Sequence, residues 1–156
     1  TEFSDPKDPT CTEDGSLGYV YCTVCHTYFT PIDGEYVPVN DKSDLVIPAH
    51  GHEISFQFYA EDGYFDLVCL HDACEFMMYG YVVVMDESGA MLALQMSDFS
   101  FNVEKNCLEL TLPICDMTPP DGKTFQGYQI GGVLYDENSI VEIISGEITQ
   151  IFIVWG

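Results

Sequence analysis

The sequence predicts a mainly β protein with a small cysteine-rich N-terminal module and a larger β-rich domain. Short runs of alternating apolar and polar residues recur, and turn signals separate them about every ten residues. Three of the seven cysteines lie within residues 11–25, which sets this part of the chain apart. We therefore expect a polar leader or linker over 1–10, a Cys/His module over 11–53 and a β-rich domain over 54–156.

The elements expected in the first module are short. β-prone runs cover 18–22, 35–39 and 44–47, and Asp14-Gly15 and Asp33-Gly34 are turn signals. No helical period of apolar residues is present. Because about 40 residues build too small a hydrophobic core to fold unaided, we expect a metal to stabilise this module.

The elements expected in the second domain are strands joined by tight turns. Residues 54–70 alternate around Glu-Asp-Gly, which predicts a hairpin, and 77–96 repeat this design around Asp-Glu-Ser-Gly. We interpret 90–96 as a strand, although its residue types also suit a short helix. Gly131-Gly132 predicts another hairpin. The remaining strand-like runs are 99–103, 108–112, 124–130, 133–135, 139–144 and 148–155.

The composition narrows the classes of partner. The chain has 26 acidic residues against four lysines and no arginine, which gives a formal net charge of −22. Such a surface repels nucleic acids and anionic lipids, so neither is an expected partner. No run of about 18 apolar residues is present, so we expect no membrane insertion. The high cysteine content suggests export, metal binding or both.

Cysteine spacing in the first module predicts a structural zinc site. Cys22 and Cys25 form a C-x2-C pair, which brings two thiolates to one metal at tetrahedral angles. Cys11 lies upstream, and His50 or His52 supplies the fourth ligand. Two alternatives remain open: a redox C-x-x-C pair, or a disulfide between Cys11 and either partner.

The other cysteines predict different chemistry. Cys69-Leu-His-Asp-Ala-Cys74 places a thiol, an imidazole and a carboxylate close together, which raises a nucleophile or a second metal as alternatives. We favour disulfides or plain buried thiols. Cys107 and Cys115 flank a predicted strand and are candidates to pair with each other or with Cys69 and Cys74.

Two phrases in the first module resemble a known repeat. "PTCTEDGSLGYVYCTVC" (9–25) and "LVIPAHGHE" (45–53) resemble a repeat of surface and secreted proteins from Gram-positive gut bacteria. Its pattern is roughly A-T-C-T-E-D-G, C-x-x-C-G and V-I-P-A-x-G-H. The resemblance implies Cys11, Cys22, Cys25 and His52 as the metal ligands, with His50 as a substitute. His26 stands where the pattern has Gly, and the loop over 27–44 is longer than usual.

The C-terminal third resembles a second repeat. Residues 110–156 are similar to the Listeria–Bacteroides surface repeat, which is related to the B-repeats of internalins, and we expect this unit to span 99–156. Tyr128 stands where Trp is usual, and Val154-Trp155 closes the unit. The resemblance implies a small β-grasp-like domain that acts as a spacer or adhesive element.

Together these features predict a non-enzymatic, extracellular or cell-wall-associated bacterial module. Its N-terminal part is expected to be zinc-ribbon-like, and its partner a protein or glycan at the cell surface. The alternative is a subunit of a fibre or pilus that self-assembles by pairing exposed strands. A third option is a small secreted enzyme that acts on glycans or peptides, although no catalytic motif is present.

Overall fold

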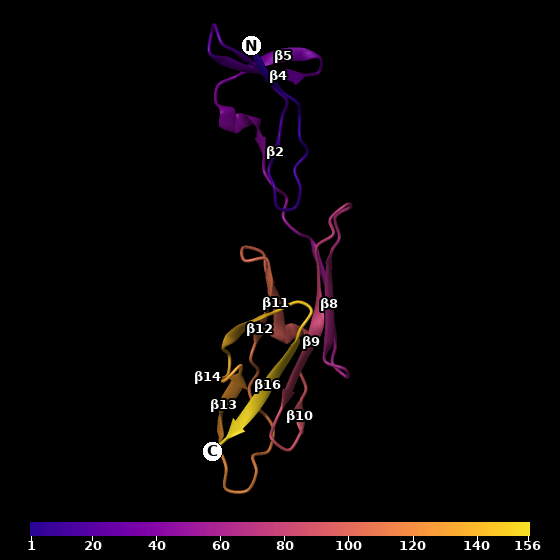
Figure 1. The fold of residues 1–156 in the computed structure, drawn as a ribbon, viewed down its shortest axis with the longest axis vertical. Helices are drawn as coiled ribbons and strands as arrows, with labels where there is room; N and C mark the ends of the chain where they lie inside the picture. Colours follow the sequence, from indigo (N-terminus) through magenta and orange to yellow (C-terminus); the bar gives the residue numbers. More distant parts are fainter. The chain divides into compact units, whose positions relative to one another are not determined.

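The computed structural model describes all residues 1–156 and confirms the mainly β class. Its helical segments are two 3-10 turns, η1 (Lys42–Leu45) and η2 (Met96–Asp98). Neither has the length that crossing a bilayer requires of a helix. The chain divides into two compact units (Figure 1). We call them the N-terminal unit (Thr1–Glu53 with His71–Cys74) and the C-terminal unit (Ile54–Leu70 with Glu75–Gly156).

Two small antiparallel sheets form the N-terminal unit. One has the strand order β1-β3-β4-β5, and the other is the pair β2-β6. Tight turns at Asp33-Gly34 and around Cys25 join the longer strands, and the residues between β5 and β6 form η1. The strands are β1 (Glu2–Ser4), β2 (Gly15–Ser16), β3 (Tyr19–Cys22), β4 (Thr27–Ile32), β5 (Glu35–Val39) and β6 (Val46–Ile47).

The residues expected as a polar leader are part of this fold. Phe3 pairs with Val20 in the β1–β3 ladder, and the Lys7 backbone exchanges two hydrogen bonds with Ser16. Residues 1–10, whose polar side chains suggested a leader or linker, are thus joined to the module by backbone hydrogen bonds.

A stack of half-buried tyrosines covers the larger sheet of the N-terminal unit. The Tyr21 and Tyr28 ring centroids lie 4.6 Å apart, and Tyr19 meets Tyr28 edge-on at 5.3 Å. The Lys42 ammonium lies 5.8 Å from the Tyr19 ring centre, within the range of a cation–π contact. Surface aromatic packing, rather than a buried core, therefore holds this sheet together.

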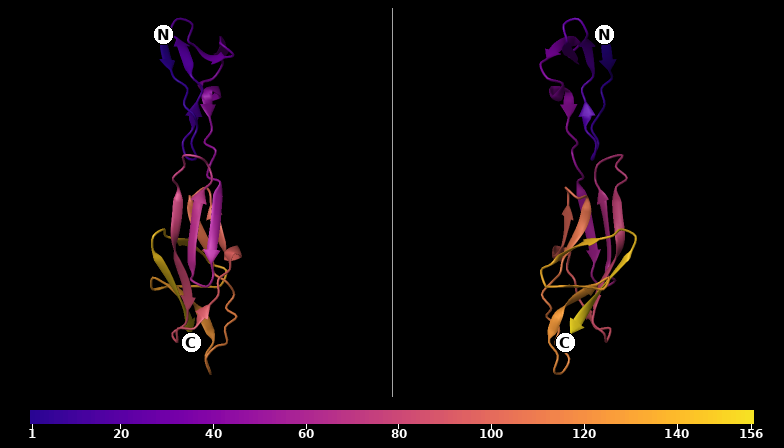
Figure 2. Two further views of the ribbon diagram at one scale, coloured as in Figure 1. Left: turned by 90° about the vertical axis from the view of Figure 1, so that its right-hand side faces the viewer. Right: turned by 60° about the vertical axis from the view of Figure 1, so that its left-hand side comes forward.

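The C-terminal unit is a two-layer β structure. Its strands run from magenta to yellow in Figure 2. The larger sheet has the order β14-β13-β16-β9-β8-β7 with β10 attached to β9, and the smaller has the order β11-β12-β15. The strands are β7 (Ile54–Tyr59), β8 (Tyr64–Cys69), β9 (Met77–Met85), β10 (Met91–Leu92), β11 (Phe99–Asn102), β12 (Cys107–Thr111), β13 (Phe125–Ile130), β14 (Val133–Tyr135), β15 (Ile140–Ile143) and β16 (Ile148–Trp155).

Alternation along these strands builds one core between the two sheets. Phe65 and Leu67 on β8 and Ile151 on β16 face the smaller sheet, whose Leu108 and Leu110 face back. These side chains belong to a single cluster of buried residues that extends through the unit. Tyr128 is also fully buried, and its hydroxyl donates to the Pro113 carbonyl at 2.9 Å. Burial raises the pKa of this phenol, which therefore stays protonated.

The predicted hairpins of this unit are confirmed. β7 pairs with β8 around Asp62-Gly63, and β13 pairs with β14 around Gly131-Gly132. Gly131 and Gly132 have φ values of 55° and 84°, which the turn requires. The run over 90–96 is a strand only at Met91–Leu92, and the 3-10 turn η2 begins at its last residue.

Candidate metal centre

The two repeat-like phrases meet in the N-terminal unit and bring Cys11 close to His50 and His52. The β2–β6 ladder pairs Gly15 with Ile47. Beyond the ladder, the Asp14 carboxylate accepts the Ala49 N–H at 2.8 Å, and the Thr10 carbonyl accepts the His50 N–H at 3.2 Å. These bonds fix the segment that carries the two histidines beside the loop that carries Cys11.

The same phrases contain residues with purely local roles. The Thr10 hydroxyl oxygen accepts the Glu13 N–H at 3.0 Å, which closes the loop around Cys11. A Cβ on Gly15 would lie 2.5 Å from the Lys7 carbonyl oxygen, so only glycine fits there. The threonine, aspartate and glycine of the T-C-T-E-D-G phrase therefore shape the loop that presents the cysteine.

A tight turn over residues 71–74 supplies the next candidate ligand. The Cys74 N–H donates to the His71 carbonyl at 3.2 Å, and Ala73 adopts a left-handed φ of 61°. At the base of the hairpin, the Cys69 N–H donates to the Phe76 carbonyl at 3.0 Å. The hairpin thus carries a C-x4-C pair with a histidine inside it.

Cys11, His52, Cys69 and Cys74 form a cluster that can hold a metal ion. One ligand atom of each lies within 4.8 Å of the others, and Cys11 is buried. His52 Nδ1 lies 3.5 Å from Cys74 Sγ. Two ligands of one tetrahedral zinc, with bonds of about 2.1 Å to nitrogen and 2.3 Å to sulfur, lie about 3.6 Å apart. The observed distance therefore suits two ligands of one ion.

A second group of ligand atoms overlaps this cluster within the N-terminal unit. Cys11, His50 and His71 also offer ligand atoms within 4.8 Å of one another. His71 Nδ1 lies 3.3 Å from Cys11 Sγ, and its Nε2 lies 3.7 Å from a Glu53 carboxylate oxygen. Cys11 thus belongs to both groups.

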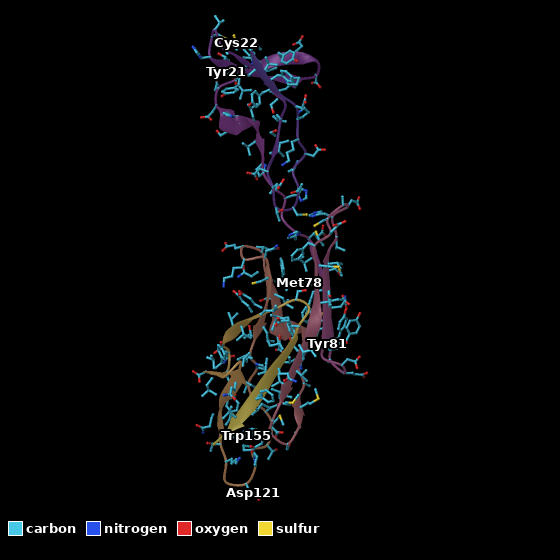
Figure 3. All side chains as sticks on the ribbon, in the orientation of Figure 1. Tyr21, Cys22, Met78, Tyr81, Asp121 and Trp155 are labelled. Atoms are coloured by element: carbon cyan, nitrogen blue, oxygen red, sulfur yellow. The ribbon has the colours of Figure 1, made fainter.

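The structure separates the ligand set predicted from the sequence. Cys11 and His52 lie in the cluster, whereas Cys22 and Cys25 lie in the β3–β4 turn and in neither group (Figure 3 labels Cys22). The Cys25 N–H lies 3.5 Å from Cys22 Sγ, and this backbone contact lowers the pKa of the Cys22 thiol. Cys22 and Cys25 thus form a local thiol pair on an exposed turn.

His26 adopts a backbone conformation that favours glycine. Its φ is 54°, in the left-handed region that favours glycine. Its Nδ1 lies 3.0 Å from the Tyr21 hydroxyl oxygen, within hydrogen-bond distance. A glycine at this position would have no side chain to make this contact.

No disulfide bond joins any of the seven cysteines. The sequence suggested disulfides among Cys69, Cys74, Cys107 and Cys115, but Cys69 and Cys74 belong to the metal-ligand cluster instead. The C-x4-C spacing with its internal histidine was the available signal for this role. Spacing alone could not distinguish a ligand pair from a disulfide.

Cys107 lies in a third group of ligand types, together with Glu109 and Glu142. The Lys105 ammonium lies 3.2 Å from Glu142 and 3.7 Å from Glu109, so one lysine already pairs with both carboxylates. Burial and then the two acids raise the pKa of the Cys107 thiol, which favours its neutral form. This group is therefore an ion-pair cluster rather than a metal site.

An exposed row of tyrosines crosses the outer face of the large sheet in the C-terminal unit. Tyr59, Tyr64 and Tyr81 are neighbours in register on β7, β8 and β9, and with Asp62 they line a hollow of about 460 Å³. The Tyr64 ring centre lies 5.8 Å from that of Tyr59 and 5.2 Å from that of Tyr81. Burial and then Asp66 raise the pKa of the Tyr64 phenol.

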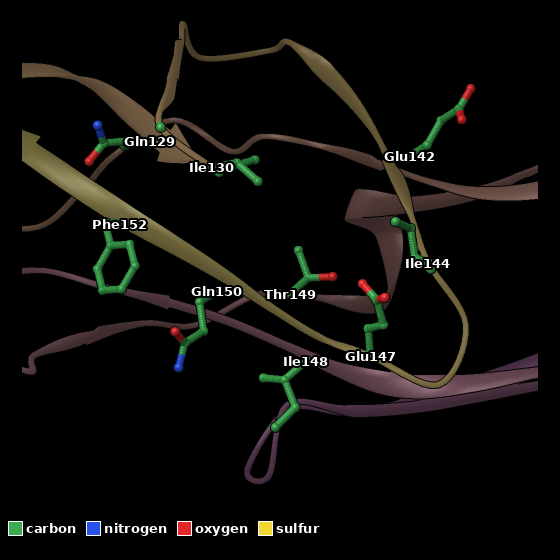
Figure 4. A pocket seen from close by; sticks show the side chains of 11 residues that line it. Gln129, Ile130, Glu142, Ile144, Glu147, Ile148, Thr149, Gln150 and Phe152 are labelled. Atoms are coloured by element: carbon green, nitrogen blue, oxygen red, sulfur yellow. The ribbon is translucent and has the colours of Figure 1, made fainter.

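A second hollow lies further along the same sheet and has a volume of about 600 Å³. Ile148, Gln150 and Phe152 project from one side of β16 into it (Figure 4). Glu142 and Glu147 supply its acidic groups, and Glu142 is the partner of Lys105. The hollow is open, and its lining mixes apolar, amide and acidic side chains. It brings no set of catalytic groups together.

Comparison with known proteins gave no match: no family model fits the chain, and neither a curated protein nor a solved structure is similar to it. The functional argument therefore depends on the geometry of the chain itself.

Proposed function

We propose that this protein binds one zinc ion tightly through Cys11, His52, Cys69 and Cys74, and that the ion stabilises the N-terminal unit. The observation that carries the proposal is the convergence of three thiols and one imidazole within 4.8 Å. Three cysteines and one histidine are a standard closed set for structural zinc, with no position left for substrate. The proposed role is therefore structural.

The small core of the N-terminal unit supports this role. Its buried hydrophobic residues are Cys11 and Leu45, and a unit of this size normally needs a metal or disulfides to fold. In such small domains the free energy of metal binding is part of the free energy of folding. We thus propose that the zinc plays the structural role it has in a zinc ribbon, with ligands from the loops around Cys11 and His52 and from the hairpin that carries Cys69 and Cys74.

The test is zinc analysis of the full chain after gel filtration, with matched cysteine variants. We expect about one zinc per chain in the unchanged protein and in Cys22→Ser, and loss of that zinc in Cys74→Ser. Cys115→Ser is a second control because Cys115 lies outside the ligand groups. Loss of zinc in Cys22→Ser with retention in Cys74→Ser would instead support the ligand set predicted from the sequence.

We further propose that the protein is a non-enzymatic extracellular or cell-wall-associated module, with a β-grasp-like C-terminal unit, that binds a glycan at a cell surface. The tyrosine row supports this candidate. Tyr59, Tyr64 and Tyr81 offer apolar ring faces to sugar C–H groups, and Asp62 accepts hydrogen bonds from hydroxyls. Calorimetric titration with oligosaccharides should show binding that Tyr81→Ala abolishes and Tyr36→Ala preserves. Binding that survives Tyr81→Ala would argue against this face.

The alternative is self-assembly into a fibre by strand pairing. Edge strand β14 supports it because Val133 and Leu134 are both 54% exposed there. Size-exclusion chromatography over a range of concentrations tests the alternative. A monomer at all concentrations argues against it, whereas oligomers that Leu134→Lys dissolves would favour it.

A further inference from the structure

The Cys11 thiol is the point at which two groups of metal-ligating side chains meet. We propose that Cys11, His50 and His71 form a second divalent-metal site, which shares the Cys11 thiolate with the zinc site and takes an ion of the zinc or cobalt type. The proposal rests on the proposed function because both sites use this thiolate. All three ligands belong to the N-terminal unit, and their ligand atoms lie within 4.8 Å of one another.

His71 is oriented as metal-binding histidines are. Its Nδ1 lies 3.3 Å from Cys11 Sγ, near the separation of about 3.6 Å that two ligands of a tetrahedral zinc have. Its Nε2 lies 3.7 Å from a Glu53 carboxylate oxygen. This is an ion-pair distance, longer than a hydrogen bond, at which the carboxylate favours a proton on Nε2 and so leaves Nδ1 to face the metal. Glu53 is therefore a positioning residue for His71.

His50 completes the group from the neighbouring segment. Its backbone N–H donates to the Thr10 carbonyl, so the residue is held directly beside Cys11. Its Nδ1 lies 3.3 Å from the Gly51 carbonyl oxygen, which suits an Nδ1–H donor and leaves the Nε2 lone pair for a metal. The His50 and His71 ring centres lie 4.5 Å apart and the rings meet edge-on.

The donor set determines the chemistry of the second site. One thiolate and two imidazoles suit zinc-type ions, and a thiolate sulfur has lone pairs enough to bind two ions at once. Three protein ligands leave a coordination position open to water or an outside ligand. Because His50 is exposed and His71 is partly exposed, the second ion should exchange faster and bind more weakly than the first.

Cobalt titration of the full chain, followed by visible absorption, tests the proposal. We expect two Co²⁺ per chain, the second binding more weakly, and one Co²⁺ in His50→Ala and in His71→Ala. His26→Ala is the matched control because His26 is an exposed histidine outside both groups, and it should keep two. Cys74→Ser should lose the tight ion while keeping one that depends on His71.

Because His71→Ala could disturb the 71–74 turn, a second variant that leaves this turn unchanged is also needed. Glu53→Gln keeps the shape of the side chain and should weaken only the second ion, by about tenfold. Saturation at one Co²⁺ in the unchanged protein, or two in both His50→Ala and His71→Ala, would overturn the second site and leave the proposed function intact. Absence of any bound ion would overturn both.

Discussion

The two units of this protein reach a folded state by different means. The C-terminal unit buries a continuous cluster of 17 residues between two sheets. In the N-terminal unit the buried hydrophobic residues are Cys11 and Leu45, and its larger sheet depends on half-buried tyrosines. Burial of apolar surface is the main favourable term in folding, at roughly 25 cal/mol per Å². The N-terminal unit lacks most of that term, so the proposed metal site is expected to supply part of its stability.

Under the proposed function, the chain divides its stability between the burial of apolar surface in one unit and the binding of a metal ion in the other. The stability of the C-terminal unit should fall when core methyl groups are removed and should hardly change when a chelator is added. The stability of the N-terminal unit should fall when a chelator removes the metal. Trp155, the single tryptophan, is buried in the C-terminal unit, so its fluorescence reports on that unit alone.

The largest expected effect is that of metal removal. Dialysis against a strong chelator should unfold the N-terminal unit, because structural zinc typically contributes about 10–16 kcal/mol of apparent binding free energy in small domains. Amide NMR signals from residues 1–53 should lose their dispersion, while Trp155 fluorescence stays unchanged. A shift in Trp155 emission, or an unaltered N-terminal spectrum, would contradict the proposed division. Zinc addition should restore the signals.

The next effect is that of a cavity in the hydrophobic core. Leu110 is fully buried, so Leu110→Ala should lower the free energy of unfolding of the C-terminal unit by about 2–5 kcal/mol. Urea titration followed by Trp155 fluorescence measures it, and the zinc content should not change. Ile114→Ala, at a position 68% exposed, should change stability by less than about 0.5 kcal/mol. Equal effects of the two substitutions would argue against this core.

A smaller effect should follow from loosening the loop that presents Cys11. The Asp14 carboxylate accepts the Ala49 N–H, so Asp14→Ala should cost about 1 kcal/mol and weaken zinc affinity by up to about tenfold. Competition with a zinc-binding dye measures the affinity. Asp5→Ala, another exposed acidic position of the same unit, should have no effect. Unchanged affinity in Asp14→Ala would show that this bond does not position the ligands.

The smallest effect concerns the pH dependence of the C-terminal unit. The Ser88 hydroxyl donates to Asp86 at 2.6 Å and, with the Ser88 and Ala90 N–H groups, lowers the pKa of this carboxyl. Because the folded-state pKa lies below the ordinary value of 3.8, the stabilisation is complete above that pH and is lost as the pH falls through the folded-state pKa.

Asp86→Asn should therefore flatten the loss of stability on acidification below about pH 4, which thermal unfolding followed by Trp155 fluorescence measures. Asp121→Asn, at an exposed position of the same unit, is the control. A wild-type acid profile in Asp86→Asn would show that these hydrogen bonds do not stabilise the folded state.

Local signals in the sequence predicted local structure well. Gly131-Gly132 and Asp62-Gly63 specify tight turns, because their backbone angles suit glycine, and both hairpins are present. The parallel pairing of β16 with β9 could not be predicted in this way, because it joins strands far apart in the sequence. Such pairings depend on how the whole core packs.

The same limit applies to the metal centre. Cys11 and His52 were predicted as ligands and do lie together, because hydrogen bonds from the two repeat-like phrases join their segments. Cys22 and Cys25 were grouped with them on the C-x2-C spacing and on the resemblance to the repeat, but they lie in the β3–β4 turn, outside the cluster. The C-x4-C spacing of Cys69 and Cys74 was a signal for ligands, but no local pattern shows that they meet Cys11 and His52.

The position of β16 also orders events during synthesis. All proposed zinc ligands have been made once Cys74 is added, so the ion can bind at that stage. β9 must wait for its parallel partner β16, whose residues are added last in this sequence. At about 5–20 residues per second, on the order of 4–16 seconds pass between the addition of Cys74 and that of Trp155. During that interval the proposed zinc ligands are all present while the larger sheet still lacks β16, so the pairing of β16 with β9 is the step most exposed to misassembly.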